Sequence, residues 1–248
     1  MSDARTGKAL VTGGAAGIGA AIAERLAADG YRVTVADRDG DAASAVADRI
    51  GGTPWQVDLL DTDALADLSL DVDVLVNNAG TQQVAPIEEF EPAVFRRLIA
   101  LMLEAPFLLV RAALPTMYAQ NFGRIIHVSS VHGVRASAYK SAYVAAKHGI
   151  EGLSKVTALE GGPHGVTSNC VNPAYVRTAL VEGQIADQAE RHGISPDEVV
   201  EQVMLAHSSV KRLIEPAEVA SLVGWLVGPD ASMVTGTSNL MDGGWTAG

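Results

Sequence analysis

The chain has very little cysteine and an excess of acidic over basic side chains. Its one cysteine, Cys170, cannot form an internal disulfide and leaves no cysteine cluster for a metal, so we predict no metal site. A single thiol also fits a reducing, cytoplasmic environment. There are 18 Lys and Arg against 29 Asp and Glu, which gives a formal net charge of -11 at pH 7, and basic residues form no run. This charge argues against nucleic acid or an anionic membrane surface as a partner.

Long apolar runs and aromatic residues are also scarce. The stretch from Met1 to Lys8 is short and polar and has no signal-peptide core, and we expect no segment long and apolar enough to span a bilayer. Aromatic residues make up 5% of the 248 positions, but hydrophobic residues make up 48%. That content can bury a sizeable core, and it fits one domain over residues 1–248 better than two.

What the chain does contain is an alternation of short β-branched runs with alanine-rich helical runs. We predict strands at Lys8–Thr12, Arg32–Ala36, Trp55–Val57, Val72–Val76, Arg124–Val128, Val166–Val171 and Ser238–Met241. We predict helices at Ala20–Asp29, Pro92–Gln120 (interrupted by Pro106 and Pro115), Tyr143–Glu160 and Pro216–Val227. Strands that are apolar on both faces and separated by helices indicate an α/β fold, a single doubly wound parallel-sheet domain of the Rossmann type.

One region breaks this rhythm. Residues from about 174 to 215 contain no predicted strand, are polar, and include Gly183, Gly193 and Pro196. They follow the carboxyl end of a strand, where α/β sheets bind ligands. An excursion of this length is more often functional than a plain connection, so we predict a helical substrate lid.

A glycine-rich turn joins the first strand to the first helix. Its spacing, Gly13-x-x-x-Gly17-x-Gly19, is a variant of the dinucleotide fingerprint. Glycines let the backbone turn tightly and approach a pyrophosphate, and the following helix presents its N-terminus to the anion. A purely structural turn would also explain such glycines.

Polar residues follow the next strands. Asp37 ends the second strand, where a carboxylate can accept both adenosine-ribose hydroxyls and would repel a 2′-phosphate, for which Ala16 supplies no cation. An ordinary turn aspartate is the alternative, and the adjacent Arg38 weakens the preference for NAD over NADP. Asp58 follows the third strand and could bond the adenine amino group or cap a helix. The run Asn77–Gly80 follows the fourth strand, as a polar turn or as a wall of the adenosine pocket.

The run from Ser141 to Lys147 places a phenol and an ammonium four residues apart, Tyr143 and Lys147. Residues at i and i+4 share a helix face, so Lys147 is predicted to lie beside the Tyr143 oxygen. A nearby cation favours the phenolate and lowers its pKa, which makes a tyrosine a proton-transfer catalyst.

Taken together, these residues resemble the short-chain dehydrogenase/reductase family over nearly the whole chain. The resemblance rests on Thr12–Gly19, Asn77–Gly80, Ser130, Tyr143-x-x-x-Lys147, Asn172–Pro173 and Met241–Gly244. It implies that Ser130 holds the substrate oxygen, that Tyr143 transfers the proton, and that Lys147 binds the nicotinamide ribose and lowers the tyrosine pKa. It also implies NAD as cofactor and a homotetramer. The implied cofactor contacts are Gly13, Ala16, Gly17, Ile18, Asp37, Asp58, Asn78, Ala79, Gly80, Tyr143, Lys147, Pro173, Val176 and Thr178.

Within that family the chain is similar to the bacterial 3-hydroxybutyrate dehydrogenases at Thr81–Pro86, Ser130–Gly133, Ser137–Tyr143 and Met241–Trp245. This similarity implies reversible oxidation of a short 3-hydroxy acid, with a small carboxylate as substrate. The implied substrate contacts are Gln82, Ser130, His132, Lys140, Tyr143, Gln184 and Trp245. A lysine, a histidine and two amides can neutralise and hydrogen-bond a small carboxylate. Individually, Lys140 could be a solvated loop lysine, His132 a satisfied loop histidine and Gln184 a plain lid residue.

The chain departs from the family pattern at three positions. Met102 stands where the family has an asparagine that supports a helix kink and a proton-relaying water, and a thioether is a poor substitute. Ala174 replaces a glycine, and Tyr175 replaces a tryptophan at the substrate methyl pocket, whereas Trp245 is retained. These changes keep two alternatives open, which are a dehydrogenase of another secondary alcohol and a catalytically silent NAD-binding module.

Overall fold

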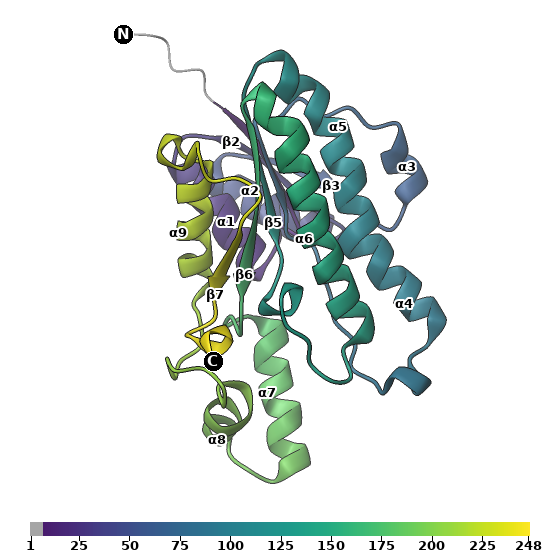
Figure 1. The fold of residues 1–248 in the computed structure, drawn as a ribbon, viewed down its shortest axis with the longest axis vertical. Helices are drawn as coiled ribbons and strands as arrows, with labels where there is room; N and C mark the ends of the chain where they lie inside the picture. Colours follow the sequence, from purple (N-terminus) through teal and green to yellow (C-terminus); the bar gives the residue numbers. More distant parts are fainter. Residues whose placement is uncertain (1–6) are drawn as a thin grey trace.

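The computed structural model describes residues 7–248 and the backbone throughout that range, but not several side chains of α7. The polar stretch at residues 1–6 lies outside the described residues. Within residues 7–248 one sheet has seven parallel strands in the order β3-β2-β1-β4-β5-β6-β7, with helices on both faces (Figure 1). The strands are β1 (Lys8–Thr12), β2 (Arg32–Asp37), β3 (Thr53–Gln56), β4 (Val74–Asn77), β5 (Gly123–Val128), β6 (Val166–Pro173) and β7 (Ser238–Met241).

The helices fall into two layers and a protruding pair. The α-helices are α1 (Gly17–Ala28), α2 (Gly40–Ile50), α3 (Thr62–Ala66), α4 (Pro92–Ile99), α5 (Ala105–Ala119), α6 (Ser141–Gly161), α7 (Ala179–His192), α8 (Pro196–Glu198) and α9 (Pro216–Val227). The shorter or wider turns are η1 (Ile87–Glu89), η2 (Ala100–Glu104), η3 (Val131–Gly133), η4 (Gly162–His164), η5 (Val199–Met204), η6 (Pro229–Ala231) and η7 (Trp245–Ala247). Figure 1 shows α1, α2 and α9 on one face, α4, α5 and α6 on the other, and α7 and α8 beyond one end of the sheet.

The two faces of the sheet bury separate cores. Val76 and Ile126 point toward α1 and α9 and pack with Ile22, Val223 and Leu226. Their neighbours in the same strands point the opposite way, because successive side chains of a strand alternate between faces. This second core contains Leu10, Leu75, Ile125, Leu109 and Met117, with the last two contributed by α5. The reading of an α/β sheet covered on both faces is therefore confirmed.

The segment from α4 through α5 corrects two expectations. Pro115 does not interrupt it, since α5 runs continuously from Ala105 to Ala119. The prediction that no segment is long and apolar enough to span a bilayer is wrong by length and composition, because the helix Pro92–Ala119 has 28 residues and a hydropathy of 1.8. Here its apolar side chains Leu98, Leu109 and Met117 are buried against the rest of the protein, as in a core helix.

The strandless region forms the predicted helical excursion after β6. Helix α7 is capped by Thr178, whose hydroxyl accepts a hydrogen bond from the Val181 N–H, and α8 is preceded by a capping box of Ser195 and Glu198. Ile185, Val199, Met204 and Leu213 form a small core of their own within this excursion. We call residues 174–215 the lid.

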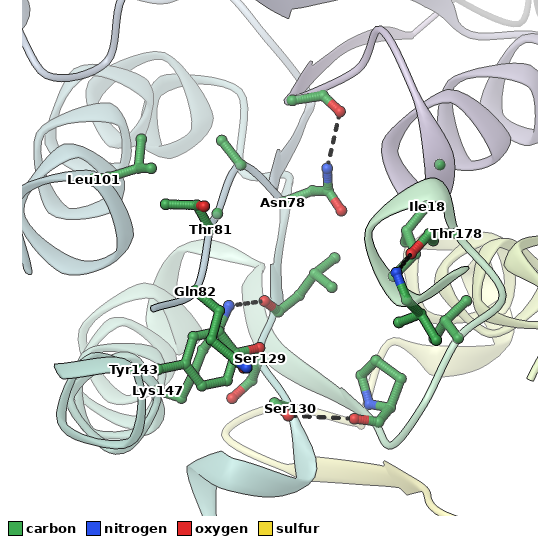
Figure 2. Close-up of a pocket in the computed structure, with 18 of the residues that line it drawn as sticks. Ile18, Asn78, Thr81, Gln82, Leu101, Ser129, Ser130, Tyr143, Lys147 and Thr178 are labelled. Carbon is green, nitrogen blue, oxygen red and sulfur yellow. Dashed lines mark hydrogen bonds between the residues drawn. The ribbon is translucent and has the colours of Figure 1, made fainter. Parts of the chain in front are cut away.

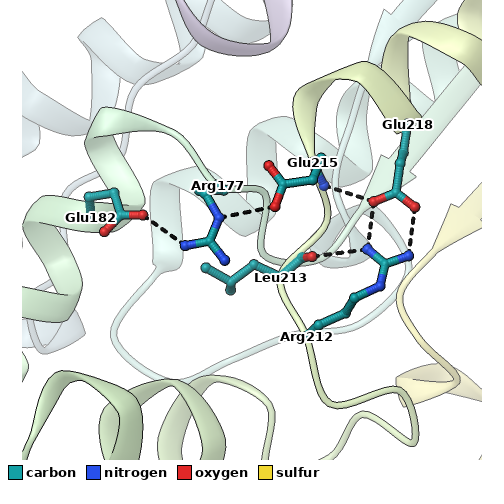
Figure 3. A network of polar contacts seen from close by, with 6 residues as sticks. All are labelled: Arg177, Glu182, Arg212, Leu213, Glu215 and Glu218. Atoms are coloured by element: carbon teal, nitrogen blue, oxygen red, sulfur yellow. Dashed lines mark hydrogen bonds and ion pairs between the residues drawn. The ribbon is translucent and has the colours of Figure 1, made fainter.

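The two ends of the lid lie side by side. Ile214 N–H donates to Tyr175 O at 2.9 Å, and Arg177 N–H donates to Ile214 O at 2.8 Å. The Arg177 guanidinium also bridges Glu215 at 3.0 Å and Glu182 at 3.1 Å (Figure 3). A second pair, Arg212 with Glu218 of α9, fixes the end of the lid to the next helix. We call this set of contacts the seam.

Candidate active site

A cavity of about 790 Å³ opens at the carboxyl ends of the strands, between the sheet, α6 and the lid. Every residue that the sequence assigned to cofactor or substrate lies on its wall, including Gln184 from the lid and Trp245 from the C-terminal segment. Figure 2 looks into this cavity, with Asn78, Thr81 and Gln82 from the loop after β4, Ser130 after β5, and Tyr143 and Lys147 from α6. The structure thus brings all of the predicted positions together, although most are far apart in the sequence.

The glycine turn is packed against the loop after β4. Gly13 has φ +60°, and a Cβ there would lie 2.9 Å from the Ala79 Cα, so a side chain could not fit. The Asn78 amide donates to Thr12 O at 2.9 Å and to Gly13 O at 3.1 Å, and the Thr12 hydroxyl accepts from Asn78 N–H at 3.0 Å. These bonds fix two strand ends against each other. The first turn of α1 has no side-chain cap, so its N–H groups face the cavity without a protein side chain bonded to them.

Two carboxylates stand at the far end of the same cavity. Asp37 accepts from Ala15 N–H at 3.2 Å and from Asp39 N–H at 3.1 Å, which fixes its carboxylate beside the glycine turn. Asp58 accepts from Leu60 N–H at 2.9 Å. The alternative reading of Asp58 as a helix cap is wrong, because Asp61 caps α3 through Ala64 N–H. A dinucleotide needs a glycine cradle for its pyrophosphate and an acceptor for its ribose, and this end of the cavity offers both.

Ser130, Tyr143 and Lys147 meet at the other end. The Lys147 ammonium donates to Val128 O at 2.7 Å and lies 5.5 Å from the centre of the Tyr143 ring. The Ser130 hydroxyl donates to Pro173 O at 3.4 Å, at the end of β6 (Figure 2). Burial lowers the pKa of Lys147 to about 8, partly offset by Cys170 and Glu151.

The sequence predicts that the pKa of Tyr143 is lowered, but in the structure it is raised. Burial raises the pKa of Tyr143, and the adjacent Ser130 hydroxyl opposes that rise. The physical reason is that Tyr143 is desolvated while the Lys147 ammonium is bonded to a backbone carbonyl beneath the ring.

A lysine and a histidine lie next to these groups. The Lys140 ammonium is 3.2 Å from His132 Nε2 and 5.9 Å from the centre of the Tyr175 ring. Burial lowers the pKa of His132 to about 4, with further lowering by Lys140, so its imidazole is neutral near pH 7 and accepts from the ammonium. Lys140 therefore brings one positive charge into a partly buried, largely aromatic corner.

Trp245 on the cavity wall makes three ring contacts, one of them to a residue outside the wall that the sequence does not predict. Trp245 stacks on Tyr175 with ring centres 6.3 Å apart and meets His132 edge-on at 5.8 Å. His207, in the lid, stacks with Trp245 at 6.1 Å. No local motif marks His207, because its position depends on how the lid folds back. Arg97 of α4 lines the cavity itself and is likewise not predicted from the sequence.

Met102 is buried in η2, where the helix widens so that Ala105 N–H bonds Ala100 O. The wider turn therefore forms without an asparagine, and Pro106, which has no N–H, prevents the normal α-helical bond at the next position. The thioether packs beneath the loop after β4, since a Cβ on Gly80 would lie 3.3 Å from the Met102 sulfur.

Comparison with known proteins agrees with this geometry. The family model "short chain dehydrogenase" matches residues 7–189. The D-beta-hydroxybutyrate dehydrogenase of Rhizobium meliloti is 43% identical, over 98% of this chain and 99% of that protein, and its namesake from Cupriavidus necator is 41% identical over 96% and 97%. The cis-4-hydroxycyclohexanecarboxylate dehydrogenase of Sinomonas cyclohexanicum is 37% identical over 96% of both chains.

A solved structure supports the fold directly. The crystal structure of a short-chain dehydrogenase/reductase family oxidoreductase from Burkholderia thailandensis superposes with a TM-score of 0.85, at 34% identity over 98% of this chain and 94% of that one. On the family model, these relatives and the shared fold, the chain belongs to the short-chain dehydrogenase/reductase family, and it is an oxidoreductase.

Proposed function

We propose that this enzyme catalyses the reversible, NAD-dependent oxidation of a short 3-hydroxy acid, with 3-hydroxybutyrate and acetoacetate as the first pair to test. The observation that carries the proposal is the Lys140 ammonium, held at 3.2 Å from His132 in the cavity that Tyr143 and Ser130 also line. A cation in a partly buried corner favours an anionic substrate group. The hydroxybutyrate dehydrogenases at 41–43% identity support the same substrate class.

NAD would lie along the cavity from Asp37 to Lys147. Its pyrophosphate would rest on the glycine turn, and its adenosine ribose would bond Asp37, whose negative charge disfavours a 2′-phosphate. The residues Asp58, Asn78, Ala79 and Gly80 would line the adenosine side, and Pro173, Val176 and Thr178 the nicotinamide side. When bound, NAD supplies the hydride acceptor for the reaction.

The protein's own groups would move the proton and hold the substrate. The Tyr143 phenolate would take the hydroxyl proton during oxidation, and the Ser130 hydroxyl would donate a hydrogen bond to the substrate oxygen. Lys147 would bond the nicotinamide ribose and supply the positive charge that favours the phenolate. Lys140, Gln82, His132 and Gln184 would surround the substrate carboxylate, and Trp245 would close the apolar side.

Steady-state turnover tests the proposal. The protein should oxidise 3-hydroxybutyrate with NAD and reduce acetoacetate with NADH, and a panel of hydroxy acids and neutral secondary alcohols should show a preference for the acids. If the protein turned over no hydroxy acid, the proposal would be contradicted.

A cyclic hydroxy acid is a second candidate. The observation that favours it is Tyr175, a smaller ring than tryptophan, which stacks flat on Trp245 and faces Lys140. A relative at 37% identity is named for a hydroxycyclohexanecarboxylate. Including that compound in the panel separates the two candidates, because both carry the carboxylate but differ in size, in ring closure and in the distance from carboxylate to hydroxyl.

We also propose a cytoplasmic homotetramer. Exposed apolar side chains on α5, α6 and β7 support the assembly, including Phe107, Leu159 and Leu240. Native mass spectrometry should give about four times the chain mass, and a monomer would contradict the proposal.

A further inference from the structure

A buried carboxylate on α6 has no part in the chemistry proposed above. Glu151 is 5% exposed and lies four residues after Lys147, on the face that packs against β6. Its Oε1 accepts from the Asn172 amide at 2.6 Å, and its Oε2 accepts from the Ser238 hydroxyl at 2.6 Å. A buried carboxylate is retained at a considerable desolvation cost unless it is hydrogen-bonded and balanced by positive charge.

The carboxylate is connected to the loop that carries Ser130. Asn172 is fully buried, and the same amide nitrogen that donates to Glu151 also donates to Ser130 O at 2.9 Å. Gly133 closes the other side, since a Cβ there would lie 2.6 Å from Glu151 Oε1. Glu151 therefore supports both ends of the segment Ser130–Gly133, one through Asn172 and the other by direct packing.

Glu151 is also the nearest negative charge to Lys147 along α6. Positions i and i+4 are neighbours on a helix surface. Burial lowers the pKa of Lys147, and Cys170 and the Glu151 carboxylate both oppose that lowering. Among the described residues the two groups form no direct ion pair, because the ammonium bonds Val128 O instead. In the part of the chain that the structure describes, the other titratable groups that interact with Lys147 are Tyr143, neutral His127 of β5 and the Cys170 thiol of β6. Neutral His132 of η3 and Arg97 of α4 line the same cavity.

We propose that Glu151 is a positioning residue for the reaction: it is the counter-charge that keeps Lys147 protonated, and through Asn172 it fixes the backbone of Ser130. This inference rests on the proposed function, in which Lys147 must be charged and Ser130 must point at the substrate oxygen. Glu151 itself would touch neither substrate nor NAD.

The variant Glu151→Gln isolates the charge. Its side-chain oxygen can still accept from Asn172, and its amide can donate to Ser238, so the packing is largely kept. Removing the negative charge should lower the pKa of both Lys147 and Tyr143. The pH profile of kcat/KM should therefore move toward acid on both limbs, by about one pH unit for a buried neighbouring charge. The pH above which NADH affinity falls, measured by fluorescence, should move in the same direction.

Two further variants complete the test. Ser238→Ala removes one bond to Glu151 but leaves the charge, so its pH profile should match the wild type. Glu151→Asp keeps the charge and withdraws it by one methylene, so kcat should fall while the profile stays in place. If Glu151→Gln does not fold, Glu151→Asp still tests the role of the charge, because a displaced profile in it would overturn the proposal.

The outcomes separate this inference from the proposed function. A slower Glu151→Gln enzyme with an unshifted pH profile and unshifted NADH binding would show that Glu151 only supports the fold, and would overturn the inference. If the wild type turns over no hydroxy acid, the proposed function is contradicted. The pH dependence of NADH binding then decides the role of Glu151 by itself, because that measurement needs no substrate.

Discussion

Replacing Lys140 by methionine should abolish the preference for acids while leaving the fold and NAD binding in place. Methionine keeps the length and the apolar stem that lies near Tyr175, and it removes only the ammonium that contacts His132 at 3.2 Å. A charge-assisted hydrogen bond is worth about 1.5–3 kcal/mol. If that contact is made in the transition state, kcat/KM for 3-hydroxybutyrate should fall about ten- to a hundredfold.

The assay compares two substrates in two enzymes. In Lys140→Met, kcat/KM for the hydroxy acid should fall, and that for a neutral secondary alcohol of similar size should change little. Gln184→Ala should show the same pattern more mildly, because an amide carries no charge. NADH titration by fluorescence provides the control for a damaged fold.

The deficit should also depend on pH. Lys140 helps to hold the pKa of His132 near 4, after burial, so removing the ammonium should raise that pKa. His132 would then gain a proton at a higher pH and partly replace the lost charge, which makes the deficit smaller in acid. Equal losses for the acid and the alcohol, at every pH, would show that Lys140 supports the fold or the proton path, and the reasoning for a carboxylate substrate would be refuted.

Three other predictions follow from the cavity. Tyr143→Phe should lower turnover by about 10²–10⁴-fold while NADH still binds, because it removes only the proton-transferring hydroxyl; near-normal turnover would exclude that role. NAD should be used far more efficiently than NADP because of Asp37, and equal kcat/KM values would contradict the assignment of that residue. Met102→Asn should keep or raise turnover but lower the melting temperature, because an amide buried in an apolar cluster loses about 1–3 kcal/mol if unpartnered. A folded but much slower asparagine variant would show that the relay does not use that side chain.

The sequence predicts most accurately those elements whose structure depends on their own residues rather than on what they pack against. Apolar strands buried on both faces have a pattern that few other structures share, and every predicted strand is present within a few residues. Helix α1 starts at Gly17, three residues earlier than predicted. Glycine has a low helix propensity, so a helix whose first residues include Gly17 and Gly19 is not recognised from the sequence until Ala20. Helices α2 and α3 were not predicted, since they are short or polar and their apolar faces are defined by what they pack against.

In the candidate site, too, local motifs predict which residues are present, and tertiary packing decides how they are oriented. Motifs located Tyr143, Lys147 and the glycine turn, but they could not give the orientation of the Lys147 ammonium toward Val128 O. Burial of the phenol decides the direction in which the pKa of Tyr143 shifts, and burial, like the Lys147 orientation, is a tertiary effect. His207 could not be found in advance for the same reason, because only the folded lid brings it to Trp245.

The seam fixes the two ends of the lid against each other. Because Tyr175 and Arg177 are bonded to Ile214 and Glu215, the lid leaves the body and returns to it at one place. Its closure entropy then depends weakly on the number of residues in between, about 0.6 kcal/mol for each doubling of length. We expect changes in residues 183–211, which lie beyond the seam, to disturb the cofactor site less than changes at Val176 or Thr178, which line it. We therefore expect this segment to be the part of the chain through which one catalytic core can be adapted to substrates of different sizes.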